Sequence, residues 1–351
     1  MWLTDKQKRE IIHDTWFLKK TPMIPFIIEV GSFHAATKEF FDNDIKESEW
    51  NENYHKAHKK IDDFNIPNNK PNLGIGIIAA AFGCDYILNS EADPWIKAII
   101  TRDNIKDVYS IKKPNLENNK IYRRAYSRIK NLELHSKLPL RLINVPSPLV
   151  TASLIWDYTS FIESTLVNKK EVHILLEMIT QTTIDFVNIQ LNKIKNLFTM
   201  GHEPWYVPKD VGIRISDDTA AIMSPDTYKE FGLPYINQIS EAFGGLIWHS
   251  CGSIEHVLPI VLKIKGLRGI DIVMTQNKWN LVRETVKGKV AINLRHYFWD
   301  HADQKEDLFQ YSKDLINYFG NKGILLMTST PTLKQAKKLS VKLKDFLLEY
   351  K

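Results

Sequence analysis

The chain has 351 residues, of which 44% are hydrophobic and 25% charged, and its formal net charge is +6 at pH 7. These values are typical of a globular protein, and this length allows one large α/β core. The lysines are dispersed, no run approaches the 18 apolar residues of a membrane span, and two cysteines exclude a disulfide framework. We therefore expect a cytoplasmic protein that binds neither nucleic acid nor membrane.

Short apolar segments rich in branched residues predict the strands. In chain order they are residues 24–30, 140–145, 212–216, 246–251, 269–273, 290–294 and 324–327. Amphipathic helices are expected at 171–194, 225–243 and 332–350. Strands that alternate with crossover helices predict a parallel sheet of the α/β class, and their number favours a (β/α)8 TIM barrel over a doubly wound sheet. We expect residues 1–351 to form one domain, in which 1–70 are a less typical helical segment plus the first strand.

The segment His249-Ser250-Cys251-Gly252 ends one of the predicted strands. Residues two apart on a strand point to the same face, so the imidazole of His249 and the thiol of Cys251 project together. Such a pair is half of a tetrahedral zinc site. The alternative is a core histidine beside a buried structural thiol. Position favours the metal site, because ligands of α/β folds bind at the carboxyl ends of strands.

Several motifs occur in a fixed order along the chain. They are the segments 72–76, 81–84, 94–95, 147–153, 216–225, 228–231, 233–235 and 249–252. As an ordered set they resemble the uroporphyrinogen decarboxylase superfamily, which includes the zinc-dependent methylcobamide:thiol methyltransferases. The resemblance covers roughly residues 70–345. It implies a barrel domain of the uroporphyrinogen decarboxylase type, with the site at the carboxyl ends of its strands.

Departures from the superfamily's patterns distinguish its branches. The decarboxylases carry substrate-binding arginines after the first strand, where this chain has Glu29 and Ser32. A carboxylate there would repel a multiply anionic porphyrinogen, so we expect no uroporphyrinogen decarboxylase activity. The methyltransferase branch has the His-x-Cys pair. It usually has a further zinc cysteine after the last strand, where this chain has Thr328 and Ser329 instead.

The resemblance and the residue chemistry together give a candidate site. The expected metal ligands are His249 and Cys251, with Glu29 as the leading third ligand unless it only caps or pairs with a lysine. Asp217 and Asp218 follow a predicted strand. One of them is expected to act as acid or base or to orient a ligand, with Asp217 favoured by its match to the superfamily's aspartate; helix capping is the alternative.

Further polar residues at strand ends are candidates for substrate binding. They are His34, Asn293 and Ser329. Cys84 is more typical of a small buried hydrophobic residue than of a ligand. His202 lies in a loop that is a candidate to fold over the site.

The resemblance implies a zinc-dependent methyltransferase that moves a methyl group from a corrinoid to a small thiol or similar acceptor. Zn²⁺ and a methylcobamide are then the cofactors, and a corrinoid-binding protein is a candidate partner beside the small-molecule substrate. Two alternatives remain open. One is a decarboxylase or lyase that acts on a small acid, and the other is a non-catalytic ligand-binding barrel.

Overall fold

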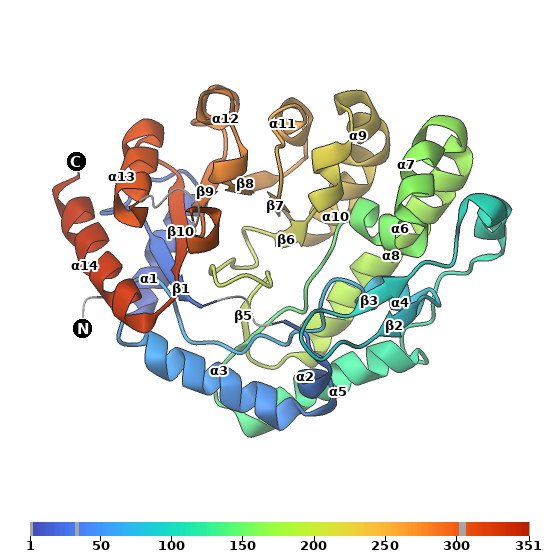
Figure 1. Cartoon of the computed structure of the whole chain (residues 1–351), viewed down its shortest axis with the longest axis horizontal. Coiled ribbons are helices and arrows are strands. Elements are labelled where there is room, and N and C mark those ends of the chain that lie inside the picture. Colours follow the sequence, from blue (N-terminus) through green and yellow to red (C-terminus); the bar gives the residue numbers. More distant parts are fainter. Residues whose placement is uncertain (1–2, 32–34, 302–306, 351) are drawn as a thin grey trace.

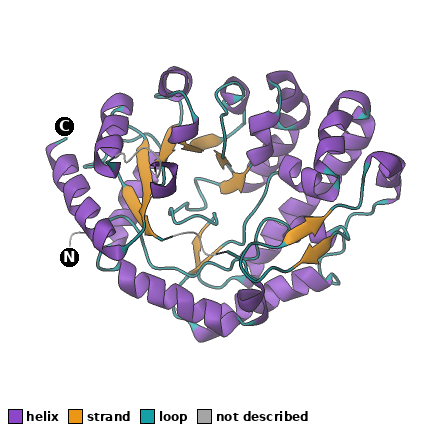
Figure 2. Ribbon diagram, viewed as in Figure 1, coloured by secondary structure: helices purple, strands orange, loops and turns teal. Residues whose placement is uncertain are grey.

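A computed structural model of the chain describes residues 3–31, 35–301 and 307–350. Its centre is a curved parallel sheet of six strands in the order β1-β10-β9-β8-β7-β6. The strands are β1 (Phe26–Val30), β6 (Ile213–Ser216), β7 (Leu246–Ser250), β8 (Leu267–Val273), β9 (Ala291–Arg295) and β10 (Ile324–Thr330). The helices lie outside the strands, as Figures 1 and 2 show.

The remaining strands are short. β4 (Leu140–Arg141) and β5 (Leu197–Thr199) form a parallel pair, and β2 (Asp85–Ile87) and β3 (Trp95–Lys97) form an antiparallel hairpin. Isolated parallel bridges join Asn69 to Leu140 and Pro146 to Ser216. The parallel α/β class is thus confirmed. The described hydrogen bonds give a six-stranded sheet and a separate pair, not one continuous eight-stranded ring.

The helices alternate with the strands over most of the chain. The α-helices are α1 (Asp5–Trp16), α2 (Lys38–Asp42), α3 (Asp44–His58), α4 (Ile77–Ala81), α5 (Lys120–His135), α6 (Pro148–Ile155), α7 (Tyr158–Val167), α8 (Lys169–Lys193), α9 (Pro225–Phe231), α10 (Leu233–Phe243), α11 (Leu258–Val261), α12 (Trp279–Val286), α13 (Leu308–Phe319) and α14 (Leu333–Glu349). Short 3₁₀ helices are η1 (Arg102–Ser110), η2 (Asp218–Ile222), η3 (Met274–Gln276) and η4 (Phe298–His301). In the described part of the chain, no helix is long and apolar enough to cross a membrane.

The single helix predicted at 225–243 is wrong, because the structure has α9 and α10 there. The break falls at Gly232, where the chain turns, and Pro234 then lies in the first turn of α10. Proline has no N–H to donate to the preceding helix, so it is tolerated only at a helix start.

Helix α1 packs against strand β8 of the sheet. The ring of Trp16 lies so close to Gly269 that an added Cβ would stand 2.6 Å from a ring carbon. The Trp16 indole N–H donates to the carbonyl of Tyr206 at 3.0 Å. Glycine at position 269 therefore leaves room for the first helix of the chain.

A buried ionic network fixes α3 against α5. The guanidinium of Arg128 is fully buried and donates to Asp44 Oδ1 at 3.1 Å and to the carbonyl of Asn72 at 2.5 Å. It also lies 3.2 Å from a carboxylate oxygen of Glu47 and donates to the carbonyl of Phe40. One arginine thus satisfies acceptors from residues 40–47 and from Asn72, which holds α3 and the segment before it onto α5.

Candidate metal centre

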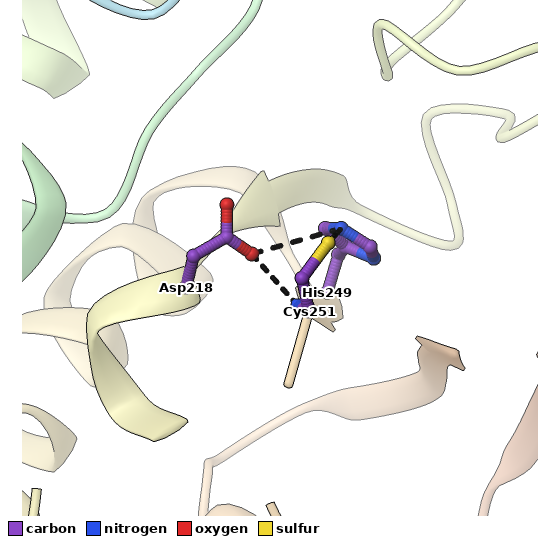
Figure 3. Close-up of side chains that lie close together, drawn as sticks. All are labelled: Asp218, His249 and Cys251. Atoms are coloured by element: carbon purple, nitrogen blue, oxygen red, sulfur yellow. Dashed lines mark hydrogen bonds and ion pairs between the residues drawn. The ribbon is translucent and has the colours of Figure 1, made fainter. Parts of the chain in front are cut away.

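The carboxyl ends of two neighbouring strands bring three potential metal ligands together. His249 lies on β7 in register with Ser216 of β6, Cys251 follows β7 directly, and Asp218 opens η2 after β6. Their ligand atoms all lie within 4.8 Å of one another. Figure 3 shows the carboxylate, imidazole and thiol converging from the two strand ends.

The distances define a compact group. His249 Nε2 lies 3.5 Å from Cys251 Sγ and 3.8 Å from Asp218 Oδ1. The Cys251 amide donates to the same Asp218 oxygen at 2.8 Å, which ties the loop after β7 to η2. His249 is buried, whereas Cys251 is exposed and the Asp218 side chain is 48% exposed. The group is therefore anchored on its inner side and open on its outer side.

Gly252 shapes the turn that carries Cys251. Its φ of +87° lies in the left-handed region, and an added Cβ would come within 2.8 Å of the Ala221 side chain. Its amide donates to Gln276 Oε1 at 2.6 Å. Because glycine alone adopts this conformation without cost, Gly252 helps to position the thiol of Cys251.

The orientation of His249 is set by Asp271 on β8. His249 Nδ1 lies 2.9 Å from the carbonyl oxygen of Asp271 and 3.2 Å from its carboxylate. The proton on Nδ1 therefore points to Asp271, and Nε2 faces Cys251 and Asp218. Burial disfavours the charged ring, but Asp271 outweighs burial and raises the pKa of His249 to about 9. A metal bound at Nε2 would replace the second proton.

Asp271 is itself held by three neighbours. Its Oδ2 accepts from Arg214 at 2.8 Å and from Arg295 at 2.9 Å, and its Oδ1 accepts from Asn293 at 2.8 Å. Burial opposes ionisation, yet Arg295, His249 and Arg214 keep the pKa of Asp271 well below its usual range. The carboxylate is thus fixed in charge and position beside the imidazole.

Replacing Asp271 with asparagine is expected to weaken zinc binding by about 10- to 100-fold, because the carboxylate that orients a ligating histidine is lost. The measurement is competition with a chromophoric chelator, on protein whose fold is checked by circular dichroism. Asp226→Asn, an exposed change on α9, is the control. Wild-type affinity in a folded Asp271→Asn protein would contradict the role.

Asp217 lies apart from this group. It is fully buried and accepts from Ser147 Oγ at 2.5 Å, Tyr228 Oη at 2.7 Å and Trp248 Nε1 at 3.0 Å. Burial raises the pKa of its carboxyl group. The sequence favoured Asp217 over Asp218 as the site residue. In the structure Asp217 links β6 to neighbouring elements, whereas Asp218 faces the imidazole and thiol. The role of either carboxylate as acid or base stays a prediction.

The other predicted residues occupy the inner face of the sheet or lie outside the described residues. Glu29 on β1 pairs in register with Ser329 on β10 and is not among the three clustered ligands, where Asp218 stands instead. Asn293 is buried beside Asp271, and its Oδ1 has no partner among the described residues. Ser329 Oγ accepts from the Phe298 amide at 3.2 Å. His34 and Ser32 lie outside the described residues.

Sequence reasoning missed a set of charged side chains inside the sheet, which we call the interior charge cluster. Its members are Glu29, Lys70, Arg141, Glu203, Arg214, Asp271 and Arg295. Glu203 comes from the segment between β5 and β6 that also carries His202, and it lies 3.5 Å from Arg295 and 3.7 Å from Arg214. Charged residues within apolar strands, such as Asp271 and Arg214, are the signal that could have revealed it.

Comparisons with known proteins agree with the sequence resemblance. A family model described as uroporphyrinogen decarboxylase matches residues 59–197. A search among curated proteins found no significant match. Among the solved structures, the chain is similar to a methyltransferase from Methanosarcina mazei, with a TM-score of 0.70 and 14% identity over 96% of this chain and 98% of that one. At this identity the likeness shows a shared fold. The resemblance to the superfamily is thereby confirmed.

Proposed function

We propose that this protein, a uroporphyrinogen decarboxylase-like chain with the fold of a methyltransferase, is a zinc-dependent methyltransferase. It would transfer a methyl group from a corrinoid to a small thiol. We further propose that the six-stranded sheet, the β4–β5 pair and the bridge at Asn69 are parts of one (β/α)8 barrel. The donor and the acceptor follow from the sequence resemblance, and the zinc requirement is supported by the site geometry.

The observation that carries the proposal is the convergence of imidazole, thiol and carboxylate within 4.8 Å. This donor set fits zinc, which binds nitrogen, sulfur and oxygen ligands in tetrahedral geometry. His249 presents Nε2 in the required direction because Asp271 holds Nδ1. Three protein ligands are typical of catalytic zinc sites, whose fourth position stays open for a substrate. The exposure of Cys251 and Asp218 leaves room on that side.

When bound, zinc would act as a Lewis acid that favours the thiolate form of a thiol, which is otherwise mostly protonated at neutral pH. The protein's own residues would hold the site: His249 on β7, Cys251 directly after β7, and Asp218 in η2. In the reaction, the acceptor sulfur forms a bond to the methyl carbon, the methyl–cobalt bond breaks with its electron pair left on cobalt, and the thiol proton goes to solvent. The corrinoid would approach the carboxyl ends of the strands, either free or carried by a partner protein.

The test follows a visible chromophore. Protein with bound zinc is mixed with methylcobalamin and a panel of small thiols, and loss of the methyl–cobalt absorbance is recorded. We expect turnover in the wild type and none above background in Cys251→Ser. If zinc-loaded protein shows no turnover with any thiol, with cognate corrinoid proteins also tried, the decarboxylase or ligand-binding alternative becomes the better explanation.

A further inference from the structure

The interior charge cluster contains cations that lack a carboxylate partner. Arg214 and Arg295 share Asp271 and Glu203, so these four side chains form a paired set. Lys70 and Arg141 are different. Neither makes an ion pair with any carboxylate of the residues that the structure describes.

Arg141 is 5% exposed and is held in place by uncharged groups. It donates to the carbonyl of His202 at 3.0 Å and to Asn68 Oδ1. These bonds fix the guanidinium but do not neutralise it. Lys70 is partly buried, and its ammonium donates no hydrogen bond within the described residues. Burial lowers the pKa of Lys70, and Arg141 lowers it further, while Glu203 opposes them. The Arg141 amide donates to the carbonyl of Asn69, the residue before Lys70, at 2.9 Å, so the two segments lie side by side. Neither cation has a carboxylate partner among the described residues.

Two cations of the cluster thus remain without a carboxylate at ion-pair distance among the described residues, whereas Arg214 and Arg295 are paired. A buried charge without a partner is unfavourable, and proteins usually remove this cost by pairing. An anion between Lys70 and Arg141 would supply the missing partner.

We propose that the carboxylate of a small carboxylic-acid substrate binds between Lys70 and Arg141. This inference rests on the proposed function, since it assigns the acceptor to the class of mercaptocarboxylic acids. The thiol would be held at the centre formed by Asp218, His249 and Cys251, and the carboxylate by the two unpaired cations.

Arg295 connects the two parts of such a site. Burial opposes its charge, but Asp271, Tyr297, Glu203 and Cys251 together hold the pKa of Arg295 well above its usual range. It lies 2.9 Å from Asp271, which holds His249 of the metal centre. It also lies 3.5 Å from Glu203, whose chain neighbour His202 accepts a hydrogen bond from Arg141. The candidate metal centre and the unpaired cations thus face the same interior.

Glu29 is compatible with an entering carboxylate. Burial and the charge of Glu203 raise the pKa of Glu29. A carboxyl group that takes up a proton donates a hydrogen bond instead of repelling the substrate. Glu29→Gln, a permanent mimic of the protonated form, is expected to bind the carboxylate at least as well as the wild type.

The experiment measures anion binding without the metal or the reaction. Chelator-treated protein is titrated with propionate and, separately, with 1-propanol, and binding is followed by calorimetry and by the thermal unfolding midpoint. We expect propionate alone to bind. Lys70→Met should weaken propionate binding by about 10- to 100-fold, the range for loss of a hydrogen bond to a charged group. Lys97→Met, an exposed change on β3, is the matched control.

Lys70→Met should also raise the unfolding midpoint of the ligand-free protein, because it removes an unpaired charge from the interior. Lys70→Arg keeps the charge and should retain propionate binding. Equal propionate affinity in wild type and Lys70→Met, or equal binding of propanol and propionate, would overturn the inference. If the protein binds propionate but never transfers methyl groups, the carboxylate site stands and only the proposed function is refuted.

Discussion

Replacing Cys251 with serine is expected to lower zinc affinity by at least about 10- to 100-fold, since even loss of a residue that only supports a ligand has an effect of this size. A hydroxyl group does not replace a thiolate as a zinc ligand. In the structure Cys251 Sγ lies 3.5 Å from His249 Nε2, so a single ion could contact both. The measurement is the zinc stoichiometry after gel filtration, together with chelator competition.

The second cysteine supplies the matched control. Cys84 is buried, its Sγ lies 3.9 Å from the Leu154 carbonyl, and burial raises the pKa of its thiol to about 12. Cys84→Ser should therefore leave zinc binding unchanged. Equal zinc content in the wild type and both variants would exclude the assignment.

The same measurement distinguishes the two candidates for the third ligand. Asp218→Asn should weaken zinc binding, because Asp218 Oδ1 lies 3.8 Å from His249 Nε2. Glu29→Gln should have little effect, since Glu29 is not among the clustered ligand atoms. The opposite pattern would restore Glu29 as the ligand expected from the sequence.

Replacing Arg128 with alanine is expected to lower the free energy of unfolding by about 3–5 kcal/mol, the usual cost of removing one partner of a buried ion pair. The loss leaves Glu47 without its ion-pair partner and removes one donor to the carbonyls of Asn72 and Phe40, while Asp44 keeps its ion pair with Arg124. Urea unfolding followed by circular dichroism measures the change.

Arg123 on the same helix provides the comparison. It is exposed and donates only to the Asn118 carbonyl at 3.1 Å among the described residues. Arg123→Ala should therefore change the unfolding free energy by less than about 0.5 kcal/mol. A similar small effect at Arg128 would mean that the network between α3 and α5 does not stabilise the fold.

The strands of the sheet could be predicted because their apolar runs are continuous. The segment expected at 246–251 became β7 (Leu246–Ser250), and that at 290–294 became β9 (Ala291–Arg295). The strands β2, β3 and β5 were not predicted, because three residues are too few to show a periodic pattern. The predicted single domain stays a prediction.

The site was only partly predictable. The spacing of His249 and Cys251 was enough to place them together, since both lie at the end of one strand. The choice between Asp217 and Asp218 depended on the 3₁₀ turn of η2, which turns one carboxylate toward Trp248 and the other toward His249. The contact of Asp271 with His249 could not be predicted, because it depends on the register between β7 and β8, which sequence patterns do not specify.

The pairing of the first strand with the last has a consequence for how the chain acquires its structure. Phe26 of β1 lies in register with Leu326 of β10, about 300 positions away along the polypeptide. During synthesis β1 therefore cannot pair with β10 until about 300 further residues have been made. Contacts of such large sequence separation form slowly. Loss of β10 would leave β1 without its partner strand and would expose the edge of β9, a site prone to aggregation.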